Sequence, residues 1–113
     1  MRENKLADLS MRFSVETIAL CDTIKNHYSV KNQLERAATS IGANIHEANY
    51  AHSRADFIAK LQIALKECYE TEYWLKLLVE ARLCEQDVIL PLYNQCGTIR
   101  RILVASINTA KKQ

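Results

Sequence analysis

The sequence predicts an all-α fold: an up-down-up-down four-helix bundle with a left-handed twist, forming a single domain over residues 1–113. Three observations predict it. The 113 residues include only two glycines and one proline, too few for the many turns of a β-sandwich or barrel. Four long segments repeat apolar residues at spacings of three and four, the period of an amphipathic helix. The hydrophobic fraction of 49% and the charged fraction of 25% are typical of a globular domain.

The first helix is expected over about residues 4–25 and the second over about 30–50. Apolar residues form a stripe along the first helix, and three more widen it. The stripe is Leu6, Leu9, Phe13, Leu20 and Ile24, and the flanking residues are Met11, Val15 and Ile18. Ser29 is predicted to cap the second helix. The core stripe of the second helix is Leu34, Ala37, Ala38, Ile41, Ile45 and Ala48. Gly42 costs this helix about 1 kcal/mol relative to alanine and suggests a tight helix crossing.

The third helix is expected over about residues 53–82 and the fourth over about 85–110. Ser53 and Asp56 have the spacing of a capping box at the start of the third helix. Because the turn before it is short, the second and third helices should form an antiparallel hairpin. Pro91 lies inside the fourth pattern, which predicts a kink there or a helix that is regular only from about Leu90. The core stripe of the fourth helix is Ile89, Leu92, Cys96, Ile99, Leu103 and Ile107.

The formal charge of +2 is too small to indicate a nucleic-acid partner by itself, but its distribution is uneven. From Asp56 to Asp87 there are seven acidic and four basic residues, whereas residues 88–113 have four basic residues and no acidic one. These four cations are candidate nucleic-acid contacts: Arg100, Arg101, Lys111 and Lys112. Cations near the negative end of a helix dipole explain the same pattern equally well.

No catalytic or metal-binding pattern is present. The di-iron sites of four-helix bundles need Glu-x-x-His pairs, but Ile24, Ala43 and Asn49 stand three residues before the three histidines. There is no P-loop and no glycine-rich nucleophile elbow. We therefore expect no catalytic residue, no metal, no cofactor and no enzymatic activity.

Four cysteines occur, and none belongs to a C-x-x-C pair. They are Cys21, Cys68, Cys84 and Cys96. The sequence has no signal-peptide pattern and no apolar run of about 18 residues, the length needed to span a bilayer. We therefore expect reduced thiols that mostly fill the core, no membrane association and a cytoplasmic location.

Two further surface features are candidate contact sites. A polar stripe runs beside the apolar stripe of the second helix, formed by Arg36, Ser40, Asn44 and Glu47. Serine and asparagine are mediocre residues inside a helix, so these side chains are expected to bond something specific. The stripe fits either a seam between helices or subunits, or a line of contacts to a partner. The third helix carries three aromatic residues that flank its core stripe and favour an oligomer interface, Tyr69, Tyr73 and Trp74.

Three stretches of the sequence resemble a bacterial family of four-helix-bundle proteins, the 23S rRNA intervening-sequence family. They are the run from Leu34 to Ala48, the run from Ser53 to Glu67 and the run from Glu70 to Leu75. The polar stripe of the second helix falls on motif positions of this family. Many members carry a proline where this chain has Gly42, and Glu-Gly where it has Glu47 and Ala48. A subset resembles this chain at both places.

The resemblance implies a ring-shaped homopentamer without an established activity. A related branch comprises the accessory proteins of diversity-generating retroelements, which resemble a basic pentameric barrel that binds nucleic acid and a reverse transcriptase. The resemblance therefore permits a non-enzymatic scaffold that binds RNA or a nucleoprotein partner. A structural or protein-interaction ring with no nucleic-acid role is the alternative.

Overall fold

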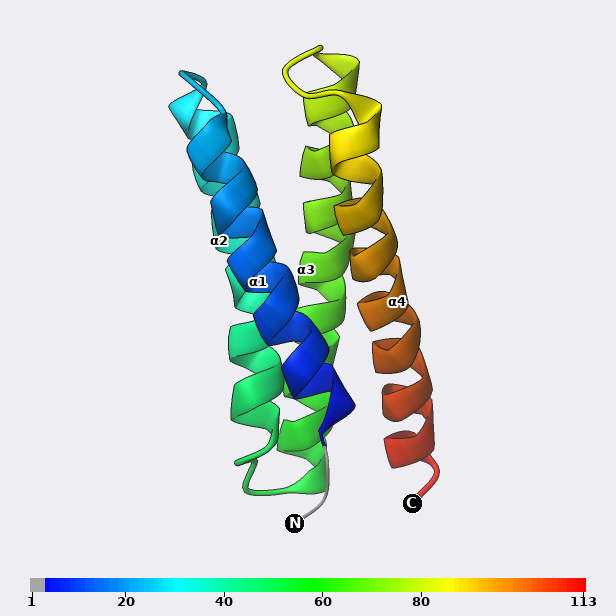
Figure 1. Cartoon of the computed structure of the whole chain (residues 1–113). Coiled ribbons are helices and arrows are strands. Elements are labelled where there is room, and N and C mark those ends of the chain that lie inside the picture. Colours follow the sequence, from blue (N-terminus) through cyan, green and yellow to red (C-terminus); the bar gives the residue numbers. More distant parts are fainter. Residues whose placement is uncertain (1–3) are drawn as a thin grey trace.

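Four antiparallel helices make up residues 4–113, the part of the chain that the computed structural model describes (Figure 1). Their bounds are α1 Lys5–Thr23, α2 Tyr28–Ala48, α3 Arg54–Glu80 and α4 Gln86–Lys111. Each bound lies within two residues of the position predicted from the sequence. The predicted all-α four-helix bundle is confirmed.

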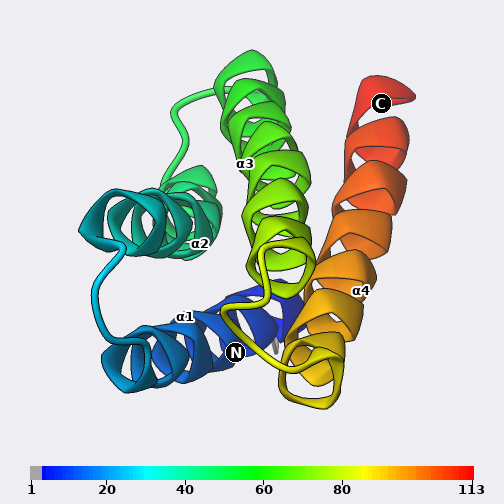
Figure 2. The same ribbon diagram turned by 90° about the horizontal axis from the view of Figure 1, so that it is seen from above.

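The helices surround one elongated core, and the molecule measures 45 × 23 × 19 Å. Helix α1 packs against α2 and α4, and helix α3 also packs against α2 and α4. Helices α1 and α3 therefore occupy diagonal corners of the bundle, which Figure 2 shows along the helix axes. The start of α1, the end of α4 and the turn between α2 and α3 all lie at the same end (Figure 1). No helix within residues 4–113 is apolar over enough of its length to cross a bilayer.

The core is built from the stripes that the periodicity predicts for α2 and α4, all of whose residues are buried. The prediction is wrong on one side of α1. Met11, Val15 and Ile18 do not widen the core but are 67%, 59% and 40% exposed. Helix α1 has two apolar faces, and the face that carries Phe13 and Leu20 is the one that turns inward.

The helix starts differ in how they are capped. Ser53 Oγ accepts a hydrogen bond from the backbone N–H of Asp56 at 3.0 Å, as the capping box predicts. The Asp56 carboxylate in turn accepts from the N–H of His52 at 3.3 Å. The predicted Ser29 cap is wrong, because α2 already begins at Tyr28 after His27, whose φ is 54° and whose side chain makes no cap bond. A left-handed turn at Asn26 and His27 reverses the chain there.

Helix α4 runs without a break from Gln86 through Pro91, so the prediction that it becomes regular only near Leu90 is wrong. Gly42 of α2 faces Ser10 and Ser14 of α1. A Cβ atom at residue 42 would lie 3.5 Å from the hydroxyl oxygens of both serines, an ordinary van der Waals distance. The two helices approach closely at this point, but the crossing does not require a glycine.

We expect Gly42→Ala to stabilise the protein by about 1 kcal/mol, because alanine has the higher helix propensity and its methyl group fits. Urea unfolding followed by circular dichroism, at one fixed protein concentration, measures this as a higher midpoint with an unchanged slope. A lower midpoint would mean that the α1–α2 contact cannot admit a methyl group.

Candidate functional site

The polar stripe of α2 lies along the contact between α2 and α3. At its upper end, Arg36 Nη1 lies 3.4 Å from Glu67 Oε2, and its Nη2 donates to Glu70. At its lower end, Lys60 Nζ lies 2.9 Å from Glu47 Oε1. Two of the four stripe residues thus pair with charges on α3. Within this chain, the two ends of the stripe therefore lie along the seam between α2 and α3.

The middle of the stripe bonds within α2. The side-chain amide of Asn44 donates to the backbone carbonyl of Ser40 at 2.9 Å and approaches its hydroxyl at 3.1 Å. The asparagine amide therefore bonds the serine one turn earlier in the same helix.

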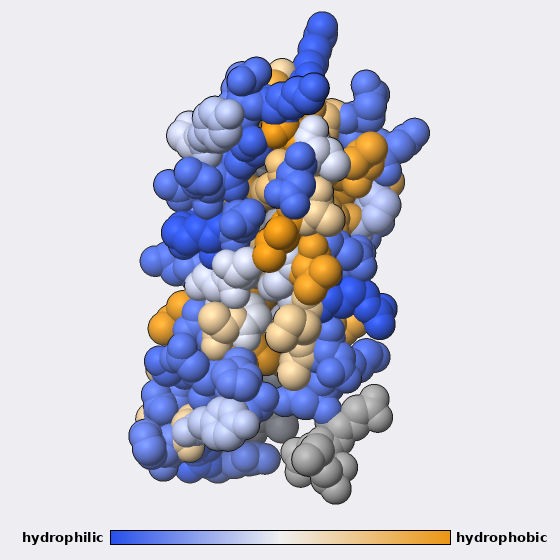
Figure 3. Space-filling view, turned by 60° about the vertical axis from the view of Figure 1, so that its left-hand side comes forward, coloured by the Kyte–Doolittle hydropathy of each residue, from blue (hydrophilic) through white to orange (hydrophobic). Residues whose placement is uncertain are grey.

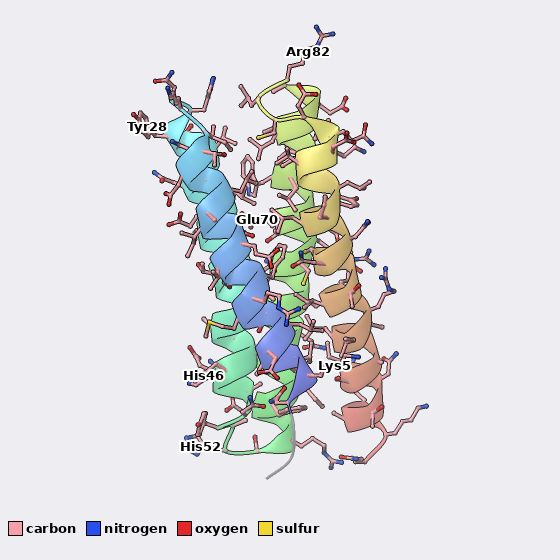
Figure 4. The ribbon with its side chains drawn as sticks, in the orientation of Figure 1. Lys5, Tyr28, His46, His52, Glu70 and Arg82 are labelled. Atoms are coloured by element: carbon pink, nitrogen blue, oxygen red, sulfur yellow. The ribbon has the colours of Figure 1, made fainter. Side chains whose placement is uncertain are left out.

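Glu70, labelled in Figure 4, makes two side-chain contacts at the upper end of the seam. Its Oε2 accepts a hydrogen bond from the indole N–H of Trp74 at 3.0 Å and also bonds Arg36. The Trp74 hydrogen bond and the nearby Arg36 guanidinium both favour the carboxylate, so the pKa of Glu70 is lowered despite its partial burial. The seam therefore joins one arginine, one indole and two carboxylates into a connected network.

The four candidate cations of α4 and its C-terminal cap divide into two kinds. Arg100 is engaged inside the chain, since its Nε lies 2.7 Å from Glu72 Oε2 and its guanidinium lies over the ring of Tyr69. Arg101, Lys111 and Lys112 are exposed, and none of them forms an ion pair with another residue of the described range 4–113. The structure therefore does not bring the four cations together as one surface.

The three candidate interface aromatics also differ in exposure. Tyr69 and Tyr73 are 54% and 59% exposed on α3. Trp74 is partly buried against the core, and its ring meets that of Tyr73 edge to face at a centroid distance of 5.0 Å. The outward surface is thus formed by Tyr69 and Tyr73, which we call the tyrosine face, while Trp74 supports it from behind.

A second exposed apolar surface was not predicted from the sequence, which placed its residues beside the core. Met11, Val15 and Ile18, which we call the outer α1 face, follow one another at helical spacing and point away from the core. Figure 3 brings α1 and α2 forward and shows apolar side chains gathered up the middle of this side. Beside Met11, a groove of about 500 Å³ runs between α1 and α2, floored by Ser10, Ser14 and Gly42. The sequence feature that indicates this surface is the spacing of four and three between its residues, which places them on a different face of the helix from Phe13.

Side chains that could bind metal do not gather anywhere in residues 4–113: no three histidine, cysteine, aspartate or glutamate residues meet as a cluster there. All four cysteines are free, as predicted, and three of them are buried. Burial raises the pKa of Cys21 to about 11, and the Cys96 thiol, against Cys68, also has a raised pKa. These thiols stay protonated at neutral pH and are poor nucleophiles.

Comparison with known proteins decides the family. A family model described as 23S rRNA-intervening sequence protein matches residues 2–105. The chain belongs to this family. It is also similar to a crystal structure of a protein of unknown function from the S23 ribosomal protein family of Bacteroides thetaiotaomicron. The two are 41% identical, the match covers 90% of this chain and 97% of the other, and the TM-score is 0.85. Among curated proteins there is no match.

The range matched by the 23S rRNA-intervening sequence family contains the whole polar seam, the tyrosine face and the outer α1 face. Lys111 and Lys112 lie beyond it. The seam joins the two regions in which the sequence resembles the family most strongly, the second and third helices. Two of its residues on α2, Arg36 and Glu47, form ion pairs with α3.

We expect Glu70→Gln to cost less than about 1 kcal/mol at pH 7, because the network is partly solvent-exposed. The lowered pKa means that the carboxylate stabilises the fold at pH values above its unfolded pKa, and that this contribution is lost as the pH falls through the folded pKa. The difference in urea midpoint between wild type and Glu70→Gln should therefore be present at pH 7 and vanish in acid. Glu80→Gln, at an exposed position of the same helix, is the control and should show no such pH dependence. A difference that persists unchanged in acid would contradict this account.

Proposed function

We propose that this member of the 23S rRNA-intervening sequence family is a non-enzymatic scaffold that assembles into a homo-oligomeric ring in the cytoplasm. The family resemblance makes a pentamer the expected ring, and RNA or a nucleoprotein its expected partner. The observation that carries the proposal is the presence of two different apolar surfaces on opposite sides of one subunit.

The first surface is the outer α1 face. Burying a valine, isoleucine or methionine side chain fully stabilises an assembly by roughly 1.5–3 kcal/mol relative to leaving it in water. Here three such side chains stand exposed together on one face of a single helix, next to a shallow groove. Contiguous apolar patches of this kind are typical of interaction sites rather than of an isolated domain.

The second surface is the tyrosine face of α3. Tyrosine is enriched at protein interfaces because its ring is apolar and its hydroxyl stays satisfied at a wet rim. Since α1 and α3 stand at diagonal corners and both faces point away from the core, the two surfaces look in opposite directions. Neither surface can cover the other within one chain.

Opposite and different surfaces favour head-to-tail association. A contact between unlike surfaces leaves one free surface at each end of the pair, so subunits keep adding until a rotation closes the ring. A contact between identical surfaces would instead stop at a two-fold dimer. The arrangement of the two apolar faces therefore supports a ring in which the outer α1 face of each subunit meets the tyrosine face of the next.

A ring with no nucleic-acid role remains the second candidate, and one observation favours it. Arg100, one of the four cations that suggested an anionic partner, is neutralised by Glu72. The two candidates differ in a simple measurement, the binding of a random RNA pool at low salt, where phosphate contacts are strongest. If no RNA binding is detected at low salt, the ring with no nucleic-acid role is favoured.

We expect the native mass of the wild type to be a multiple of the 12.9 kDa chain, about 65 kDa for five subunits. Val15→Glu and Tyr73→Glu should each reduce it to that of a monomer with unchanged helicity, because each buries a charge in one of the two surfaces. Light scattering coupled to size-exclusion chromatography measures the mass. Val88→Glu, at a 52% exposed position outside both surfaces, is the matched control.

Mixing the two variants separates a head-to-tail contact from a two-fold one. Each variant keeps the surface that the other has lost, so an equimolar mixture should form a heterodimer and grow no further. If the contact joined two outer α1 faces, Tyr73→Glu would dimerise alone and the mixture would contain no heterodimer. A wild type that is monomeric at micromolar concentration would end the ring proposal.

A further inference from the structure

The charge of the bundle is divided between its two halves. We cut each helix at its midpoint, so that one half, called the terminal half, contains residues 4–14, 38–66 and 99–113. It carries nine basic and three acidic side chains, a formal charge of +6. The other half, residues 15–37 and 67–98, carries five basic and nine acidic side chains, a formal charge of −4. The small net charge of the chain therefore conceals a strongly basic end.

Most of the cations in the terminal half are not neutralised locally. Lys60 pairs with Glu47, and Arg100 pairs with Glu72 of the other half. The remaining seven form no ion pair with any residue of the described range, and they are Lys5, Arg12, Arg54, Lys66, Arg101, Lys111 and Lys112. Unpaired cations of this density attract a polyanion and release its counterions on binding.

A hollow joins two of these cations across the end of the bundle. Arg101 is part of the lining of one groove of about 570 Å³, and Arg54 is part of the lining of a second groove of about 420 Å³. The two share Phe57 as part of their lining, so they adjoin each other. The two linings also offer hydroxyl and amide groups, from Asn49, Ser53, Ser106, Thr109 and Gln113. Adjoining grooves with this lining offer a nucleic acid both cationic contacts for its phosphates and hydrogen-bonding groups.

An aromatic side chain stands exposed at the same end. Tyr50, in the turn between α2 and α3, is 73% exposed, and its ring lies 5.3 Å from that of His46. Figure 4 shows His46 and His52 at this end of the bundle, away from Tyr28 and Arg82. An exposed aromatic ring at the same end as unpaired cations is a combination that can bind single strands, because unpaired bases stack on the ring while cations hold the phosphates.

We propose that the terminal half binds single-stranded nucleic acid, with Arg54, Arg101, Lys111 and Lys112 contacting phosphates and Tyr50 stacking on a base. This inference rests on the proposed scaffold function and names the partner chemistry and the surface. In a ring closed by rotation, every subunit presents the same end to the same side if its long axis follows the ring axis. The basic ends would then form one continuous face.

The test uses the untagged full-length protein and a labelled oligouridylate RNA of about 20 nucleotides, with binding followed by fluorescence anisotropy at about 50 mM salt. Arg101→Glu/Lys112→Glu reverses two charges, one on α4 and one at its C-terminal cap. Lys25→Glu/Lys76→Glu makes the same change of charge at the opposite end and is the matched control. The first double variant should weaken binding at least tenfold and flatten its salt dependence, while the control should leave both close to wild type.

A second pair of variants tests the stacking role. Tyr50→Ala should weaken binding by about tenfold, whereas Tyr28→Ala, which removes an equally exposed tyrosine from the other end, should not. Blunt duplex RNA of the same length should bind more weakly than the single strand. Equal loss in both double variants, no loss in Tyr50→Ala, or equal binding of duplex and single strand would each overturn the proposal.

Measuring the native mass of the same samples distinguishes a failure of the RNA-binding proposal from a failure of the ring proposal. A wild type that forms a ring and does not bind the oligouridylate overturns the nucleic-acid surface alone. A monomer that binds the RNA through Tyr50 and the terminal cations overturns the ring alone.

Discussion

The short turn between α2 and α3 is the constraint on which the rest of the structure depends. Residues 49–53 reverse the chain. The turn is closed by two hydrogen bonds, in which Ser53 Oγ accepts from the N–H of Asp56 and the Asp56 carboxylate accepts from the N–H of His52. With α2 and α3 fixed side by side, Arg36 meets Glu67 and Glu70, and Lys60 meets Glu47. Helices α1 and α4 then have only the opposite side of this hairpin to cover. The diagonal placement of α1 and α3, and with it the opposite direction of their apolar faces, follows from that.

The positions of the helices could be predicted from the sequence because the information is local. Apolar spacings of three and four identify α2 and α4, and the Ser53 cap places the start of α3. The orientation of α1 could not be predicted in the same way. Met11, Val15 and Ile18 are as apolar as the core residues beside them, and periodicity alone does not say which of two apolar faces turns inward.

The residues that pair with the polar stripe could not be predicted from the sequence either. Arg36 meets acidic residues more than thirty positions away, and the register between two helices is set by the packing of their core side chains rather than by local sequence. The same holds for Arg100, whose neutralisation by Glu72 changes it from a candidate ligand contact into a link between α3 and α4. Charge counted along the sequence gave +2, whereas charge counted along the axis of the folded bundle separates into two unlike halves.

The buried thiols have a consequence for how the bundle moves. Cys21, Cys68 and Cys96 lie on α1, α3 and α4 and are at most 5% exposed, whereas Cys84, in the turn between α3 and α4, is only partly covered. An alkylating reagent can reach each buried sulfur only when the helix that carries it separates from the core. The rate at which each thiol is modified therefore reports the opening of its own helix, with Cys84 as the internal standard, and no label or substitution has to be introduced.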